Sequence, residues 1–216
     1  MTIEDVERTS LTAKGQKTRE RILQTAAELM LANGVAGTTV EDVCEAARVG
    51  RSQIYHYFDG KSELVRGVIA HQTDQVLGHQ EPYISELTSW SNWQAWRDRI
   101  VQTQCELGCV GGCPIGSLAN ELADSDELAR RVLNQSFDRW QRAFSSGIEQ
   151  MQARHILSSR ADPATLGTFI LSALQGGLLL CQVRKDVGSL EIALDGALAY
   201  LYTYREDEIA IDSPSR

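Results

Sequence analysis

The segment 38–64 constrains the fold of this 216-residue chain more than any other stretch. In it, Val40, Val43 and Ala47 recur at intervals of three and four residues, which is the spacing of one buried face on a helix. A second helical pattern over 51–58 begins almost at once, so a very tight turn has to connect the two. The segment therefore predicts two short helices that pack against each other.

Capping and burial signals refine this prediction. Thr39 can begin the first helix, and Asp42 can return its hydrogen bond, because T-x-x-D is the spacing of a capping box. In the second helix, Ile54 and Phe58 can face inward, which leaves Arg, Ser, Gln, Tyr and His side chains facing outward. A short helix with such outward residues, supported by a helix behind it, is the arrangement of a helix-turn-helix that binds DNA.

Composition and charge are those of a globular helical protein. The chain is 43% hydrophobic and 23% charged, and only 17 glycines and 4 prolines interrupt its helical patterns. The net charge is −8, but residues 10–66 hold eight basic and seven acidic residues, so this segment is at +1 and the remainder at −9. A near-neutral segment on an acidic body suits local phosphate contact. The alternative is that acidity only keeps a cytoplasmic protein soluble.

Targeting signals and cysteines point to the cytoplasm. The N-terminus is acidic without an apolar core, and we find no apolar run long enough to span a bilayer, so we expect neither a signal peptide nor a membrane contact. Five cysteines without a secretion signal predict reduced thiols. We expect no cofactor and no metal site.

Helical periodicity along the whole chain predicts an all-α fold of about nine helices. Besides the two short helices within 38–58, we expect helices over 14–33, 61–77, 92–107, 115–123, 126–151, 163–183 and 189–204.

In this order the elements resemble the N-terminal domain of the tetracycline-repressor (TetR) family. The matching residues are Arg21-Ile22-Leu23, Ala26-Ala27, Gly34, Thr38-Thr39-Val40, Ala47, Tyr55, Tyr57-Phe58 and Lys61-Ser62-Glu63-Leu64. The segment 112–119 is also similar to LmrA/YxaF-type regulators. The resemblance implies a homodimer in which a helical body binds a small molecule and releases DNA. The division that follows is a disordered N-terminus over 1–13, a helix-turn-helix domain over 14–60, a ligand-binding and dimerisation domain over 61–206 and a loose tail over 207–216.

The resemblance also assigns DNA contacts. It places Thr39, Tyr57 and Lys61 on phosphate-contacting positions, and Arg51, Gln53 and Tyr55 on positions that face bases; Ser52 faces outward beside them. Lysine and tyrosine donate to phosphates, arginine can clamp guanine, and glutamine can pair with adenine.

Two residues at the turn depart from the family pattern. Arg48 stands where the family usually has glycine, which predicts a non-glycine residue in the left-handed conformation or an altered turn. Gly50 stands where a capping serine or threonine is usual, and glycine is a weaker cap.

Aromatic residues in the body suit either a core or a ligand pocket. Stripes of Trp and Phe are more often core, but a repressor of this kind needs an apolar cavity, and polar residues near the stripes could orient a ligand. The predicted ligand-binding residues are Trp93, Trp96, Gln104, Cys113, Asn120, Phe137 and Trp140.

The four-residue spacing of Cys105, Cys109 and Cys113 leaves three alternatives. The thiols can be small apolar residues along a helix. Cys113 can be a thiol sensor, because it precedes Pro114 at a predicted helix start, where a thiolate is favoured. A metal site is the third alternative, although no nearby histidine completes a set.

The segment 166–180 is apolar on nearly every side, and a helix of this kind is buried on every side. Together with the last helix it predicts a four-helix dimer interface, formed by Leu171, Leu174, Leu178, Leu194 and Leu201. The alternative is a core helix within one chain.

These features predict a ligand-responsive regulator, namely a repressor that a small apolar or aromatic effector releases from a near-palindromic operator. Effector binding would shift the helix over 61–77 and change the spacing of the two DNA-binding domains. An enzyme is not indicated, because the glycine-rich stretch 108–116 lacks a phosphate-loop ending and H-E-x-x-H does not occur. The alternative is a helical ligand-binding or thiol redox-sensing protein with weak or lost DNA binding.

Overall fold

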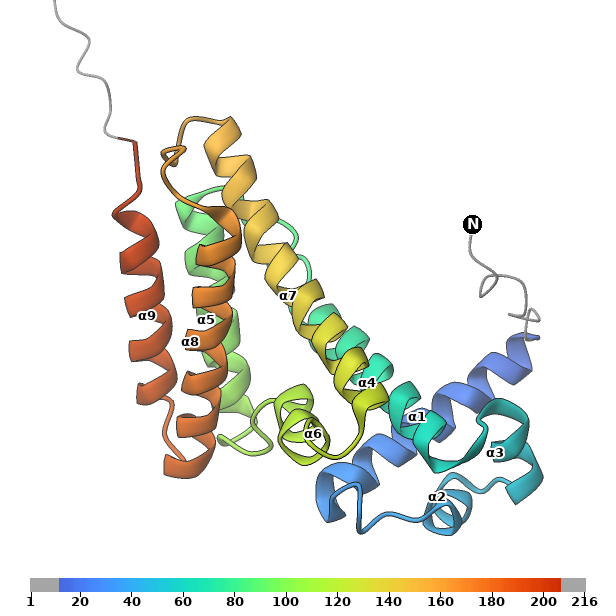
Figure 1. Cartoon of the computed structure of the whole chain (residues 1–216). Coiled ribbons are helices and arrows are strands. Elements are labelled where there is room, and N and C mark those ends of the chain that lie inside the picture. The colour runs from blue at the N-terminus through green and yellow to red at the C-terminus, as the bar shows by residue number, and fades with distance from the viewer. Residues whose placement is uncertain (1–11, 207–216) are drawn as a thin grey trace, which may run out of the picture. The chain divides into compact units, whose positions relative to one another are not determined.

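The structure is a computed structural model and describes residues 12–206 (Figure 1). This range forms nine α-helices and one isolated antiparallel bridge between Leu157 and Arg205, which confirms the predicted all-α fold. The tail predicted as loose, 207–216, lies outside the described residues. Of the N-terminus predicted as disordered, only Thr12 and Ala13 are described, and they cap and begin the first helix.

The observed helix bounds lie within a few residues of the predicted ones. Side-chain caps begin several of the helices: Thr12, Thr39, Ser89 and Asp162 each accept a hydrogen bond from a backbone N–H of the first turn. The helices are α1 Ala13–Asn33, α2 Val40–Ala47, α3 Arg51–Tyr57, α4 Gly60–Gly78, α5 Trp90–Glu106, α6 Pro114–Leu122, α7 Glu127–Ala153, α8 Pro163–Arg184 and α9 Gly188–Tyr202.

The described residues divide into two compact units. The first consists of residues 12–75 and 114–136, and the second of residues 76–113 and 137–206. The first unit therefore holds α1, α2, α3 and α6, and the second holds α5, α8 and α9, while α4 and α7 contribute residues to both. The predicted domain boundary at residue 60 separates the DNA-binding segment from the ligand-binding body, whereas the two units are defined by compact packing. The predicted boundary therefore stays a prediction.

The core of the first unit fixes α3 against its neighbours. Ile22 of α1, Val43 of α2 and Ile54 of α3 are all 0% exposed, so each short helix is anchored by burial of its apolar face. A Cβ atom on Gly67 of α4 would lie 3.0 Å from the Phe58 ring, which is tighter than most Cβ contacts, so the glycine eases this close approach. Burial therefore holds α3 in one orientation.

An aromatic cluster forms part of the core of the second unit. Trp93, Trp96 and Phe144 are each 0% exposed, and their ring centres lie 5.0 to 5.9 Å apart in tilted and edge-on arrangements.

Helices α8 and α9 pack against each other in the second unit (Figure 1). The five leucines assigned to the dimer interface are at most 8% exposed within the single chain, which favours the core alternative for them. The assignment of a dimer contact to Leu171, Leu174, Leu178, Leu194 and Leu201 stays a prediction. By length and composition α8 could also span a membrane, as core helices of water-soluble proteins often could.

Candidate DNA-binding site

The start of α2 has the predicted capping box. The Thr39 hydroxyl accepts a hydrogen bond from the Asp42 N–H at 3.1 Å, and the Asp42 carboxylate accepts one from the Thr39 N–H at 2.8 Å. Hydrogen bonds from the Thr39 side chain and backbone lower the pKa of Asp42, because they favour the ionised carboxylate. The first helix of the pair is therefore held at its N-terminus as the sequence predicted.

The two unusual residues at the turn are both accommodated. Arg48 adopts the left-handed conformation, with φ 52° and ψ 51°, so the turn keeps the backbone shape that usually requires glycine. Gly50 caps α3 without a side chain, and the Gln53 Oε1 atom accepts the hydrogen bond of the Gly50 N–H at 3.1 Å instead. The turn that aims α3 is therefore regular in shape.

Buried anchors hold α3 in place and leave a polar pair in solvent. Ile54 and Phe58 are 0% and 2% exposed, which confirms the predicted inward face. Arg51 and Tyr55 are exposed and lie together, because Arg51 Nη2 donates to the Tyr55 hydroxyl at 3.4 Å and the guanidinium lies 5.6 Å from the ring centre. The ion pair of Arg51 with Glu41, 3.0 Å long, is exposed and therefore weak enough for DNA to replace.

The outward residues of α3 lie on two flanks of the helix. With about 100° between successive residues, Tyr55 lies about 40° from Arg51, whereas Gln53 lies about 200° away. Ser52 and His56, which the sequence predicted to face outward, are exposed between the two flanks, although no DNA contact had been assigned to His56. The predicted base contacts therefore divide between one flank with Arg51 and Tyr55 and another with Gln53, and their roles stay predictions.

The three predicted phosphate contacts lie at helix ends near α3. Thr39 is the exposed N-cap of α2, and Tyr57 is the half-buried last residue of α3. Lys61 is half-buried in the first turn of α4. Backbone N–H groups at helix N-termini favour anions, so the positions of Thr39 and Lys61 suit the predicted phosphate contacts.

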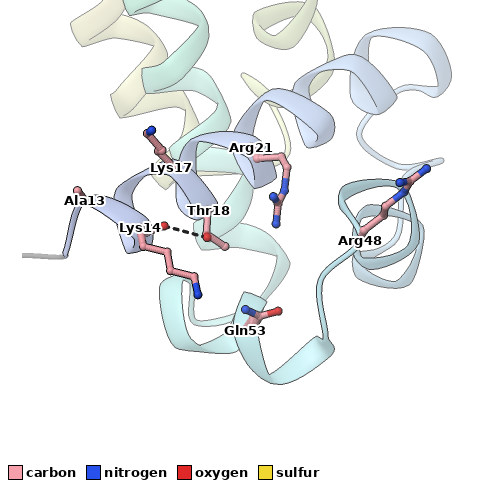
Figure 2. Close-up of a pocket in the computed structure, with 7 residues that line it drawn as sticks. All are labelled: Ala13, Lys14, Lys17, Thr18, Arg21, Arg48 and Gln53. Atoms are coloured by element: carbon pink, nitrogen blue, oxygen red, sulfur yellow. Dashed lines mark hydrogen bonds between the residues drawn. The ribbon is translucent and has the colours of Figure 1, made fainter.

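A basic cleft opens between α1 and the turn region of the same unit. Its volume is about 550 Å³, and Figure 2 shows the side chains of Lys14 and Arg21 extending from α1 toward Gln53 on α3. The sequence prediction assigned no role to the cleft cations, although their spacing along α1 was visible. The lining residues are Ala13, Lys14, Lys17, Thr18, Arg21, Arg48 and Gln53.

Two of the predicted ligand-binding residues belong to a satisfied core. The indole N–H groups of Trp93 and Trp96 donate to Met151 Sδ at 3.2 Å and to Gln80 Oε1 at 3.0 Å. Both rings are 0% exposed, so their polar and apolar atoms are already engaged. This favours the core alternative for these two residues.

Gln104 and Trp140 differ, because each has a buried polar atom that lacks a partner. They are 7% and 2% exposed, and Gln104 Oε1 and Trp140 Nε1 have no hydrogen-bond partner among the described residues. Gln175 Nε2 on α8, which the sequence prediction missed, shares this property. An unpaired buried polar group costs about 1–3 kcal/mol, so these atoms are candidates for hydrogen bonds to a ligand.

The other predicted ligand-binding residues lie in varied surroundings. Cys113 is 9% exposed, Phe137 is half-buried on α7, and Asn120 is exposed on α6. Their role in ligand binding stays a prediction.

The cysteines of the second unit differ in exposure and acidity. Cys181 is 0% exposed, and burial, with a smaller effect of the neighbouring Cys109 thiol, raises its pKa to about 12. Cys105 is exposed, whereas Cys109 is buried. Among residues 12–206, no group of three or more His, Cys, Asp or Glu side chains is arranged to hold a metal ion.

Comparisons with known proteins match both halves of the chain. Residues 22–68 match the model of bacterial regulatory proteins of the tetR family. Residues 91–195 match the model of the C-terminal domain of LmrA/YxaF-like transcriptional regulators. The first match covers the helix-turn-helix, and the second covers most of the body.

Individual relatives extend over most of the chain. An uncharacterised HTH-type transcriptional regulator of Lactococcus lactis subsp. lactis is 28% identical over 83% of this chain and 91% of its own length. YxaF, an HTH-type regulator of Bacillus subtilis, is 26% identical over 82% of this chain and 90% of its own. A TetR regulator from Chloroflexus aurantiacus shares the fold, with a TM-score of 0.74 at 24% identity over 90% of this chain and 98% of that one. This chain belongs to the TetR family of helix-turn-helix transcriptional regulators, with a C-terminal domain of the LmrA/YxaF-like type.

Proposed function

We propose that this regulator is a cytoplasmic homodimeric repressor that binds a near-palindromic operator and releases it when a small effector binds. The main support for DNA recognition is the exposed face of α3. There Arg51 and Tyr55 lie together, while the buried side chains of Ile54 and Phe58 hold the helix in place. In this proposal Arg51 contacts a guanine edge in the major groove. Thr39, Tyr57 and Lys61 contact phosphates and set the position of the helix.

The exposed apolar face of α8 and α9 supports the homodimer. Val183 is 72% exposed and Ile192 76% exposed, and Phe169, Leu179 and Leu180 lie on the same side of α8 as Val183 by helical spacing. Apolar side chains in such a stripe are typical of a protein interface. In this proposal the dimer interface is the exposed apolar face of α8 and α9.

The unpaired buried atoms support an effector site in the second unit. Gln104 Oε1 can accept a hydrogen bond, whereas Trp140 Nε1 and Gln175 Nε2 can donate one. An apolar or aromatic molecule with donor and acceptor groups would supply partners for atoms of these kinds. Effector binding then shifts α4 (Gly60–Gly78). This shift changes the spacing of the two DNA-binding domains of the dimer.

The proposal is tested by fluorescence anisotropy with a labelled DNA fragment from upstream of the regulator's own gene. The wild-type protein is expected to bind with a Kd below about 10⁻⁸ M and to prefer this fragment over unrelated DNA by at least about 10³-fold. Arg51→Ala with Tyr55→Ala should remove this preference, whereas Gln135→Ala, at an exposed position on α7, should keep it. Equal affinity for both DNAs would contradict the proposal.

A further inference from the structure

The cations of the cleft between α1 and α3 are unusual because nothing described neutralises them. Lys14, Lys17 and Arg21 follow one another at intervals of three and four residues, so they lie on one face of α1. Arg48 joins them from the turn. Their side chains make no ion pair or hydrogen bond with another described residue, and none of the described residues that line the cleft is acidic.

The conformation of the turn makes Arg48 available to this cleft. Its left-handed backbone is one that glycine adopts at less cost. The side chain is exposed, and its backbone N–H bonds to the carbonyl oxygens of Cys44 and Glu45 as a helix cap. The turn therefore keeps its shape and places Arg48 at the edge of the cleft, with its side chain extending away from Gln53 in Figure 2.

Gln53 and α1 complete the polar lining. Because Gln53 Oε1 accepts from the Gly50 N–H, its Nε2 group is left as a donor on the cleft side of α3. Ala13 and Lys14 belong to the first turn of α1, where backbone N–H groups favour an anion. Like charges on one helix face repel each other, and a bound anion would relieve this repulsion.

We propose that this cleft binds a phosphate group, with Lys14 and Arg21 as its main ligands, Lys17 and Arg48 at its rim and Gln53 as a neutral donor. The site is separate from the phosphate contacts assigned to Thr39, Tyr57 and Lys61. A DNA backbone phosphate is the source that its position beside α3 favours, and this part rests on the proposed function. The cleft then adds affinity without reading sequence, because phosphates carry no base information.

The test compares two doubly substituted variants that lose the same charge. The first is Lys14→Ala with Arg21→Ala in the cleft, and the control is Arg142→Ala with Arg154→Ala at exposed positions of the second unit. Operator affinity is measured between 50 and 300 mM KCl, where each lost phosphate contact lowers the salt slope by about 0.9. We expect the cleft variant to lose about 1–2 units of slope while keeping the wild-type ranking of operator variants. The control should match the wild-type slope.

A second arm separates DNA from a soluble source of phosphate. Inorganic phosphate is titrated into the DNA-free protein, and the amide resonances of the protein are followed by NMR. The DNA assignment is overturned, and the site is assigned to a soluble anion, if three results occur together. Phosphate must saturate the shifts of resonances near the cleft in the wild type, the cleft variant must lose this response, and the salt slopes of the two proteins must be equal. Unchanged slopes without phosphate binding would overturn the site itself. If the wild type shows no operator preference, the proposed function fails instead, and the phosphate titration alone decides the cleft.

Discussion

The carboxylate of Glu121 on α6 holds the backbone of Val35 in the loop that joins α1 to α2. Glu121 Oε2 accepts from the Val35 N–H at 2.9 Å, and Oε1 accepts from the next N–H, of Ala36, at 2.8 Å. All three residues belong to the same compact unit. Residues far apart in sequence are thus joined by a two-point contact just before the helix-turn-helix, and this contact fixes the loop that leads into α2.

Removing this contact should loosen the loop. Glu121→Ala deletes both acceptors and should lower the free energy of unfolding by about 1–2 kcal/mol, since the hydrogen bonds are charge-assisted but partly exposed. Glu121→Gln keeps one acceptor oxygen and should cost less. Urea unfolding measures both variants, with Glu20→Ala, at an exposed position on α1, as the control. A Glu121→Ala variant as stable as this control would show that the loop does not depend on the contact.

Substitution of Arg48 should separate stability from DNA binding. Arg48→Gly removes the cost of a left-handed non-glycine residue, so the free energy of unfolding should rise by about 0.5–1 kcal/mol. Operator affinity should fall at the same time, because a cation leaves the rim of the cleft. Arg48→Lys, which keeps the charge, should retain most of the affinity. Urea unfolding measures the stability of each variant, and anisotropy titration measures its operator affinity. A stabilised Arg48→Gly variant with full affinity would exclude a DNA role for this side chain.

Charges on the outer face of α8 and α9 should dissociate the dimer. Val183→Glu with Ile192→Glu places two carboxylates on side chains that are 72% and 76% exposed, so each folded chain should stay intact while the dimer separates. Leu128→Glu alters a 53% exposed leucine on α7 and should leave the mass unchanged. Light scattering coupled to size-exclusion chromatography reports the mass. A dimeric double variant would place the interface elsewhere.

Thiol reactivity should follow exposure along the cysteines of the second unit. Cys105 is exposed and should react first with iodoacetamide at pH 8. Cys181 should stay unmodified until the protein unfolds, because it is buried and its pKa is raised to about 12, so almost no thiolate forms at the pH of the experiment. Peptide mass spectrometry after timed quenching gives the order. Early labelling of Cys113 would instead support the thiol-sensor alternative.

The sequence predicted the fold well because local signals determine it. Helical periodicity located each helix to within a few residues, and the T-x-x-D spacing predicted the capping box of Thr39 and Asp42. The left-handed conformation of Arg48 was one of two alternatives that its position allowed. These features depend on residues close together in the chain.

Features that depend on distant residues were not predictable in the same way. Segment 166–180 is apolar all round, so its periodicity could not distinguish the face that packs against α9 from the face left exposed. For this reason the predicted dimer leucines include only side chains that are buried within the chain. The cleft combines α1 with the turn, and the loop contact joins Glu121 to Val35, so both pairings required the folded chain.

Selection of bound DNA from a random-sequence library tests the central claim most directly. If the regulator is a dimer that recognises DNA through α3, sequencing of the bound pool should recover an inverted repeat whose half-sites are centred about one helical turn, or a multiple of it, apart. Arg51→Ala should lose the preference for one base pair in each half-site while keeping their spacing. A pool without an enriched inverted repeat, or a repeat unchanged by Arg51→Ala, would contradict the account.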